Sequence, residues 1–257
     1  MTFRKIIFLF VVCSFSIYMA LFCSALYHLD LNYFFKSFSE KRILSALWLS
    51  ISAASIATVL ALIFSIPTGY ALSRYNFFLK PVADVLLELP VLISPAALGA
   101  LLLIFLQTPP GLIIREYLVE IVYTFGGIIL AQFISVLGIC TRMIKSTFDE
   151  ITPRYENIAR TLGATPVQCF FRVSLPLAKN GIFYAGLLTW AKAIGEFGAT
   201  ITLAGSIPMK TETLPTAIYM KLSTADVKGV VVLIVLLLTM SLTILIAARF
   251  TVKKNHD

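Results

Sequence analysis

The sequence predicts an all-helical protein that crosses a membrane six times. Hydrophobic residues make up 59% of its 257 residues and charged residues only 13%, with a mean hydropathy of +0.91. Such a composition excludes a water-soluble globular domain. Six apolar stretches each exceed the roughly 20 helical residues that span a bilayer. They cover residues 6–27, 44–72, 82–106, 121–143, 181–204 and 227–250.

The first apolar stretch follows Arg4 and Lys5, as the hydrophobic part of a secretory signal peptide would. It is longer than the roughly 7 to 15 residues of that part. In addition, Phe22 before Cys23 does not fit a lipoprotein cleavage site. We therefore expect residues 6–27 to be retained as the first span. No linker, low-complexity tract or repeat divides the chain, so residues 1–257 are expected to form a single transmembrane domain.

The orientation follows from the positive charges between the stretches. With both termini in the cytoplasm, thirteen Lys and Arg residues lie inside and seven outside, as the positive-inside rule requires. The same distribution explains the formal charge of +8 without nucleic acid as a partner. The outer connections, residues 28–43, 107–120 and 205–226, are too short to be a substrate-binding domain.

The sequence offers no catalytic or cofactor site of its own. Its four cysteines form no CxxC pair, and its two histidines, His28 and His256, do not cluster, so we expect no metal. No Gly-rich loop ends in Gly-Lys-Ser/Thr, so the chain is not expected to bind ATP. If it transports actively, ATP and Mg belong to a partner subunit. We expect the chain itself not to be an enzyme.

The longest polar interruption, residues 142–180, is predicted to form two short helices joined at Gly163. Tyr155, Ile158, Ala159 and Leu162 recur at helical spacing, so the first helix has an apolar face, while Arg154, Glu156, Asn157 and Arg160 can face water. Glycine turns left-handed at low cost and ends this helix. Thr165 caps the next helix, with Pro166 at its first position, and Leu175-Pro176 ends it.

An apolar-faced helical pair beside a membrane either docks a soluble partner or lies in the lipid interface. Binding to lipid headgroups favours a uniformly basic polar face. Here Asp149, Glu150 and Glu156 alternate with Arg154 and Arg160, which favours docking.

The segment Asn157-Ile158-Ala159-Arg160-Thr161-Leu162-Gly163, followed ten residues later by Val173-Ser174-Leu175-Pro176, resembles the EAA loop of ATP-binding-cassette (ABC) importer permeases. In that family the loop forms the coupling helices that contact the ATPase subunit. Asn157 stands where the family has glutamate, and Glu156 lies beside it. The resemblance implies coupling roles for Glu156, Asn157, Ala159, Thr161, Leu162, Gly163, Ala164 and Pro166.

The segments from Trp190 to Thr200 and from Thr213 to Tyr219, with Glu88-Leu89-Pro90, resemble molybdate, tungstate and sulfate permeases. The resemblance implies the type I ABC importer permease fold, with the coupling pair between spans 4 and 5, in the cytoplasmic membrane of a bacterium or archaeon. It also implies three kinds of partner: two ATPase subunits, a second permease copy and an extracytoplasmic oxyanion-binding protein.

Candidate pathway or gate residues are Glu88, Pro95, Lys192, Glu196 and Phe197. Ionisable groups within a span are costly, so Lys192 and Glu196 suggest a function, although residues one helical turn apart can also simply neutralise each other. The prolines of the third span either line a cavity or only shape packing.

The predicted function is therefore that of the permease subunit of an ATP-driven importer for molybdate- or tungstate-type oxyanions. A sulfate or thiosulfate permease is the alternative within this class. A channel or secondary transporter without an ATPase is the alternative outside it.

Overall fold

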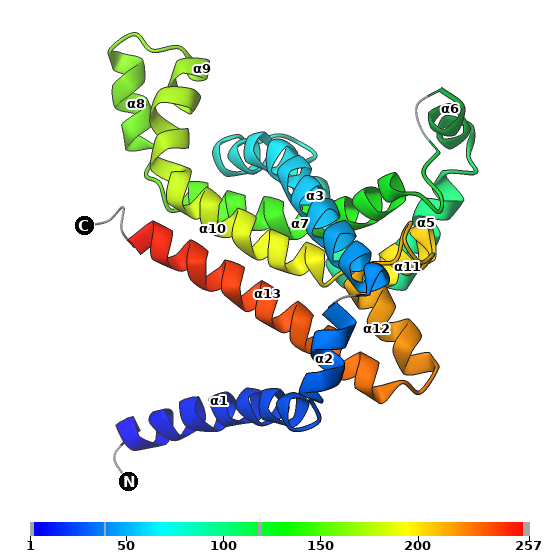
Figure 1. Ribbon diagram of the computed structural model, residues 1–257. Helices are drawn as coiled ribbons and strands as arrows, with labels where there is room; N and C mark the ends of the chain where they lie inside the picture. The colour runs from blue at the N-terminus through cyan, green and yellow to red at the C-terminus, as the bar shows by residue number, and fades with distance from the viewer. Residues whose placement is uncertain (1–2, 39, 118–119, 254–257) are drawn as a thin grey trace.

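The computed structural model describes residues 3–38, 40–117 and 120–253, and within these ranges it contains helices and turns but no strand (Figure 1). The all-helical class predicted from composition is confirmed. Among these residues, four helices are long and apolar enough to cross a membrane. They are α1 (Phe3–Tyr27), α3 (Lys41–Arg74), α7 (Phe125–Asp149) and α13 (Val227–Lys253), the last over Val227–Ile246.

The third predicted span, residues 82–106, is not one straight helix. It consists of α4 (Lys80–Leu92) and α5 (Pro95–Phe105), which are bent by 115° and meet the criteria for a span only as a pair. Ser94 between them is extended, with ψ 143°, and its hydroxyl accepts a hydrogen bond from the N–H of Ala97. Since a proline disfavours helical geometry in the residue before it, Ser94-Pro95 ends α4 and starts α5.

The fifth predicted span, residues 181–204, is also interrupted. The helix α10 (Leu175–Ile194) ends at Gly195, and α11 (Gly198–Ala204) starts three residues later. Neither helix is among the described helices that meet the length and hydropathy criteria for crossing a membrane. The count of six spans therefore stays a prediction.

The core is the seam between α3 and α7, which α10 covers. Four alanines of α3 have no exposed surface: Ala53, Ala54, Ala57 and Ala61. Small side chains let helix backbones approach closely, which is the common way for helices to pack within a bilayer. The facing side of α7 is equally buried, through Val136, Cys140 and Ile144.

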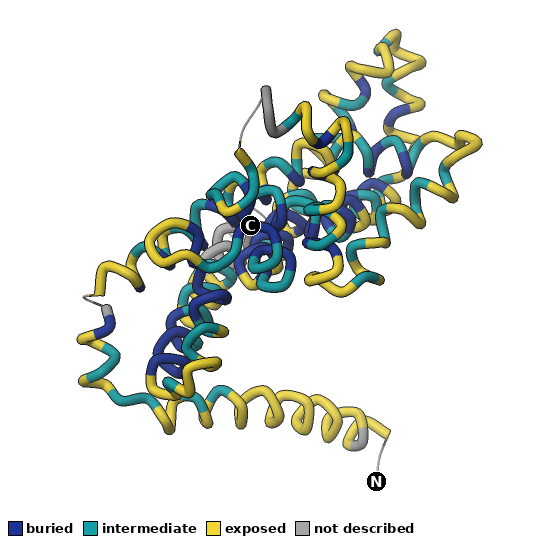
Figure 2. Tube along the Cα trace, turned by 90° about the vertical axis from the view of Figure 1, so that its right-hand side faces the viewer, coloured by how far each residue is buried: buried dark blue, intermediate teal, exposed yellow. Residues whose placement is uncertain are grey.

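The first helix lies apart from this core. None of the part of α1 that is apolar enough to cross a membrane is buried, and its exposed residues extend over almost its whole length (Figure 2). Its C-terminal half approaches α13, and α1 connects through α2 (Leu31–Phe38) to the start of α3. With a mean hydropathy of 2.6 over that part, we expect lipid to cover it.

The outer segment 205–226, predicted as a connection, folds back into the protein. Residues 211–217 are all buried, and α12 (Leu214–Ser223) packs on α13 and α3. The Glu212 carboxylate accepts two hydrogen bonds from the Arg42 guanidinium, at 2.7 and 2.6 Å, and the Ser50 hydroxyl accepts one from the N–H of Leu214 at 2.8 Å. These partners lie 170 and 164 positions apart, so local sequence patterns do not reveal them.

Candidate functional site

The two helices predicted between residues 142 and 180 are present and project from one end of the molecule (Figure 1). They are α8 (Arg154–Thr161) and α9 (Pro166–Cys169), and we call them the α8–α9 hairpin. Gly163 has φ +88°, and the N–H groups of Gly163 and Ala164 donate to the carbonyls of Arg160 and Ala159 at 3.0 Å each. This is the Schellman pattern of a helix ended by glycine. The prediction that Gly163 ends the first helix in a left-handed conformation is confirmed.

The start of α9 also agrees with the sequence. The Thr165 hydroxyl accepts from the N–H of Gln168, and the Gln168 side chain accepts from the N–H of Thr165 at 2.9 Å. Pro166 occupies the first helical position, where its missing N–H costs nothing. Both ends of the turn are therefore fixed by local hydrogen bonds, which gives the hairpin a defined shape.

The expected end of the second helix at Leu175-Pro176 is wrong. The chain passes from α9 through a π-helical turn, η1 (Phe170–Ser174), directly into α10. A proline inside an α-helix removes one i to i−4 hydrogen bond, and a π turn changes the hydrogen-bond register at this point. Pro176 therefore lies in the first turn of α10, where it is tolerated, and α9, η1 and α10 form one continuous helical segment.

The expectation that Glu156 faces water is also wrong. The residue is only 3% exposed, and it is the buried residue of α8. The neighbouring apolar residues point outward instead, with Leu162 83% exposed and Tyr155, Ile158, Val167 and Phe171 about half exposed or more. The hairpin thus presents an apolar surface to the outside, while its acidic residue is turned toward the core.

Glu156 is held by three groups that the sequence analysis did not connect to it. One carboxylate oxygen accepts from Arg74 Nε at 2.7 Å and from the Ser174 hydroxyl at 2.8 Å, and the other accepts from the Tyr70 hydroxyl at 3.0 Å. Burial disfavours the ionised carboxylate, but these hydrogen bonds outweigh it and lower the pKa of Glu156 from its ordinary value of 4.5. Glu156 is therefore an anion at neutral pH.

This pKa predicts how stability depends on pH. A carboxylate with a lowered pKa stabilises the fold fully above its ordinary pKa, and the contribution is lost as the pH falls through the lower folded value. Glu156→Gln is expected to cost about 2 kcal/mol at pH 7, as for a hydrogen-bonded charge. The difference in melting temperature between the purified wild type and this variant should shrink below pH 4.5. A difference that stays constant down to pH 3 would contradict the lowered pKa.

The interrupted helices bring together most of the candidate pathway residues. Gly198, which starts α11, lies against Pro95 and Ala96 at the start of α5, so closely that an added Cβ would lie 2.7 Å from the Pro95 side chain. Phe197 contacts the ring of Tyr219 with centroids 5.0 Å apart. The break before Pro95 and the break at residues 195–197 therefore lie side by side.

Lys192 and Glu196 flank this point with very different exposure. Lys192 Nζ lies 3.4 Å from Glu196 Oε2, and the side chains are 47% and 1% exposed, respectively. The other Glu196 oxygen accepts from the N–H of Ala199 at 3.1 Å. The carboxylate is thus tied to the start of α11, and the lysine ammonium remains partly open with unused donor capacity.

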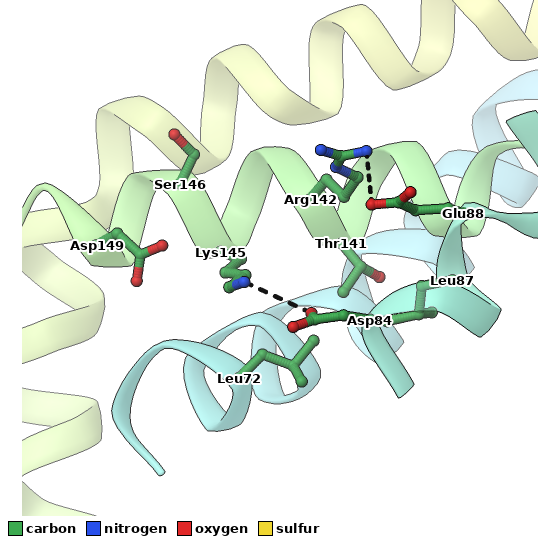
Figure 3. A pocket seen from close by; sticks show the side chains of 9 residues that line it. All are labelled: Leu72, Asp84, Leu87, Glu88, Thr141, Arg142, Lys145, Ser146 and Asp149. Carbon is green, nitrogen blue, oxygen red and sulfur yellow. Dashed lines mark hydrogen bonds and ion pairs between the residues drawn. The ribbon is translucent and has the colours of Figure 1, made fainter. Parts of the chain in front are cut away.

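Glu88 does not join this group. It lines a separate cavity of about 300 Å³ between α4 and α7, where it pairs with Arg142 at 2.9 Å while Asp84 pairs with Lys145 at 3.5 Å (Figure 3). Leu87 and Pro90 on the same side of α4 lie against Gly138 of α7. Which side of α4 meets α7 decides the position of Glu88, and the sequence alone does not contain that information. Among the described residues, no group of His, Cys, Asp and Glu is arranged to hold a metal ion.

Comparison with known proteins relates this arrangement to membrane transport. Residues 61–254 match the family described as "Binding-protein-dependent transport system inner membrane component". The sulfate transport system permease protein CysW of Synechocystis is 32% identical over 85% of this chain and 81% of its own length. The molybdenum transport system permease protein ModB of Escherichia coli K12 is 33% identical over 70% of this chain and 80% of its own length. The molybdate/tungstate transport system permease protein WtpB of Methanocaldococcus jannaschii is 32% identical over 64% of this chain and 66% of its own length.

Solved structures share the fold at lower identity. A chain of a bacterial alginate ABC transporter, in complex with an alginate-bound periplasmic protein, superposes with a TM-score of 0.72, covering 95% of this chain and 90% of that one at 17% identity. A chain of the inward-facing MetNI methionine ABC transporter superposes with a TM-score of 0.66, covering 82% and 95% at 18% identity. These likenesses establish the fold alone.

Proposed function

The chain belongs to the family of inner membrane components of binding-protein-dependent transport systems, and from this premise we propose that it is the permease subunit of an ATP-driven importer for tetrahedral oxyanions, with molybdate and tungstate as the first candidates. The observation that carries the proposal is the α8–α9 hairpin, a rigid turn whose apolar face is open and whose carboxylate is turned inward. Like its relatives, the chain is a permease subunit and not itself an enzyme.

The exposed surface of the hairpin is the proposed contact with the ATPase subunit. Tyr155, Ile158, Leu162, Val167 and Phe171 form an apolar ridge on two helices, which suits a groove in a soluble partner. Of the residues implicated by resemblance, Asn157, Thr161, Leu162, Gly163 and Pro166 are exposed on this surface, Ala159 and Ala164 are half-buried, and Glu156 is not available. Direct contact is therefore proposed for the first seven, and Glu156 must act indirectly.

The full transporter would contain two such permease chains, two ATPase subunits that bind ATP and Mg, and an extracytoplasmic binding protein. In our proposal, ATP binding draws the two hairpins together and moves the spans toward the outward-open state, and hydrolysis resets them. Such a cycle needs only that ATP favours one of two conformations. The chain lies in the cytoplasmic membrane, and we propose that both of its termini face the cytoplasm.

The pathway is proposed to pass the two helix breaks, where Lys192 supplies a cation. Irregular backbone within a membrane protein is tolerated where it is buried in protein or lines a cavity. Because Glu196 is tied to Ala199 and its charge is offset by Lys192, the local field does not exclude an anion. The Lys192 ammonium can then donate to a passing oxyanion.

Replacing Lys192 by methionine tests this pathway. Methionine keeps the length of the side chain but not its charge, so the complex should still assemble. Oxyanion uptake into proteoliposomes should fall about tenfold, because a hydrogen bond to a charged group contributes about 1.5 kcal/mol or more and about 1.4 kcal/mol is a factor of ten. Lys210→Met, which removes an exposed charge from the outer segment, is the matched control and should transport normally. Normal uptake by the Lys192 variant would remove it from the pathway.

The function itself is tested by the ATPase activity of the reconstituted complex, with its binding protein loaded in turn with molybdate, tungstate, sulfate or nothing. We expect molybdate or tungstate to stimulate hydrolysis several-fold over the empty protein. Equal or greater stimulation by sulfate would favour the second candidate, a sulfate permease. The 32% identity to the sulfate permease protein CysW over 85% of this chain supports that candidate. If no ATPase subunit assembles with the chain, the importer proposal fails.

A further inference from the structure

The buried carboxylate of Glu156 connects the hairpin to two membrane helices. Arg74 is the last residue of α3, Tyr70 lies one turn earlier, and Ser174 is the last residue before α10. All three donate to the same carboxylate, at 2.7, 3.0 and 2.8 Å, respectively. One side chain of α8 thus holds the ends of α3 and α10 at once.

Arg74 extends the connection to a third helix. Its Nη2 donates to the carbonyl of Ile151 at 2.7 Å, directly after α7, and its Nη1 donates to the Ser73 hydroxyl at 3.1 Å. The Arg74 side chain is only 8% exposed, so its charge depends on Glu156 for compensation. The Tyr70 ring packs edge-on against Phe148 of α7 and Phe170 of η1, with centroids 5.3 and 4.8 Å apart. The ends of α3, α7 and α10 therefore meet at one buried polar cluster, formed by Tyr70, Arg74, Glu156 and Ser174.

The position of this cluster matters because α8 has little other attachment. Among the eight residues of α8, Glu156 is the buried one, and the large apolar side chains of the helix point away from the protein. Apolar residues in place of both Glu156 and Arg74 would avoid the cost of burying a charge pair, so stability alone does not account for the pair here. A hydrogen-bonded ion pair, in contrast, fixes both the distance between α8 and α3 and their relative orientation.

We infer that Glu156 is a positioning residue that makes α8 move as one body with α3 and α10. It does not touch the ATPase; it transfers a displacement of the exposed hairpin surface to the membrane helices through Arg74, Tyr70 and Ser174. This inference rests on the proposed function, because it assigns to Glu156 the step between ATPase docking and movement of the spans.

The decisive variant is Glu156→Gln, which keeps the shape of the side chain but leaves Arg74 uncompensated. The reconstituted complex should retain basal ATPase activity within twofold, because none of the residues proposed to contact the ATPase subunit is changed, while the number of oxyanions transported per ATP hydrolysed falls about fivefold. The matched control is Glu150→Gln, which removes an equal charge from an exposed position of the same segment and should leave the ratio unchanged. An unchanged ratio in Glu156→Gln overturns the inference.

Milder variants cover the case in which Glu156→Gln does not assemble. Tyr70→Phe and Ser174→Ala each remove one donor to the carboxylate and keep the rest of the side chain nearly unchanged. Each should lower the ratio of transport to hydrolysis about twofold, and together they should lower it further. If both retain the wild-type ratio, Glu156 does not position α8.

Hydrogen exchange of the full-length chain in detergent separates this inference from the proposed function. Amides of α8 should exchange at least tenfold faster in Glu156→Gln than in wild type or Glu150→Gln, because α8 is released from α3. Unchanged exchange contradicts the inference even if the complex transports oxyanions. If the wild-type complex neither assembles nor transports, the proposed function fails whatever the exchange shows.

Discussion

Replacing Gly163 by valine should reduce ATP-driven uptake at least tenfold. Gly163 has φ +88°, and a Cβ at this position would meet nothing within 4 Å, so the effect arises from the backbone and not from crowding. A branched side chain in a left-handed conformation is strained by about 1 to 3 kcal/mol, and every 1.4 kcal/mol changes a population tenfold. The hairpin would relieve this strain by giving up the Schellman turn, which moves the docking surface.

Gly163→Asn is the matched control, because asparagine tolerates the left-handed region far better than valine. It should keep uptake within about twofold of the wild type. Both variants are compared by uptake into proteoliposomes and by the amount of ATPase subunit that copurifies. Wild-type uptake in Gly163→Val would show that the shape of the hairpin is not used for coupling.

Replacing Gly138 by alanine should destabilise the permease by about 3 kcal/mol, the upper part of the range for overpacking. The added Cβ would overlap the carbonyl oxygen of Leu87, which belongs to the backbone of α4 and cannot yield without moving that helix. The shift would also separate the pairs Asp84–Lys145 and Glu88–Arg142 and open the cavity between α4 and α7.

For a chain of this size, such a loss corresponds to a fall in melting temperature of roughly 6 to 12 °C, measured in detergent. Gly126→Ala is the control on the same helix. Its Cβ would meet only the Thr124 hydroxyl, at 3.6 Å, and alanine is the better helix former, so its melting temperature should be equal or slightly higher. If the two variants have the same melting temperature, the contact between α4 and α7 is looser than the structure indicates.

Local features of the chain could be predicted from sequence wherever neighbouring residues decide them. The turn at Gly163, the cap at Thr165 and the place of Pro166 depend on a few adjacent residues, and all three are as predicted. Apolar length likewise predicted the helices α1, α3, α7 and α13. Pro176 was misjudged because a π turn and a helix end both accommodate a proline.

The arrangement of the sites depends on contacts that the sequence does not show. Glu156 was expected in water because its partners Tyr70 and Arg74 lie 86 and 82 residues earlier. The prolines of the third span were expected to line a cavity or to shape packing, but they did not predict a bend of 115°, which depends on how α5 packs against α11. Glu88 was grouped with Lys192 and Glu196 as a pathway candidate, whereas Gly138 draws α4 onto α7 and places Glu88 elsewhere.

The unbroken run from α9 through η1 to the end of α10 has a mechanical consequence. At about 1.5 Å per residue, the helical segment from Pro166 to Ile194 is roughly 40 Å long. Its backbone hydrogen bonds run along the helix axis, so the segment resists compression in that direction. In the proposed importer, a displacement of the end next to α8 would therefore be carried along this helix to its other end, at Ile194. The helical hydrogen bonding stops there, beside Lys192 and Glu196, so we expect these two residues to move with it.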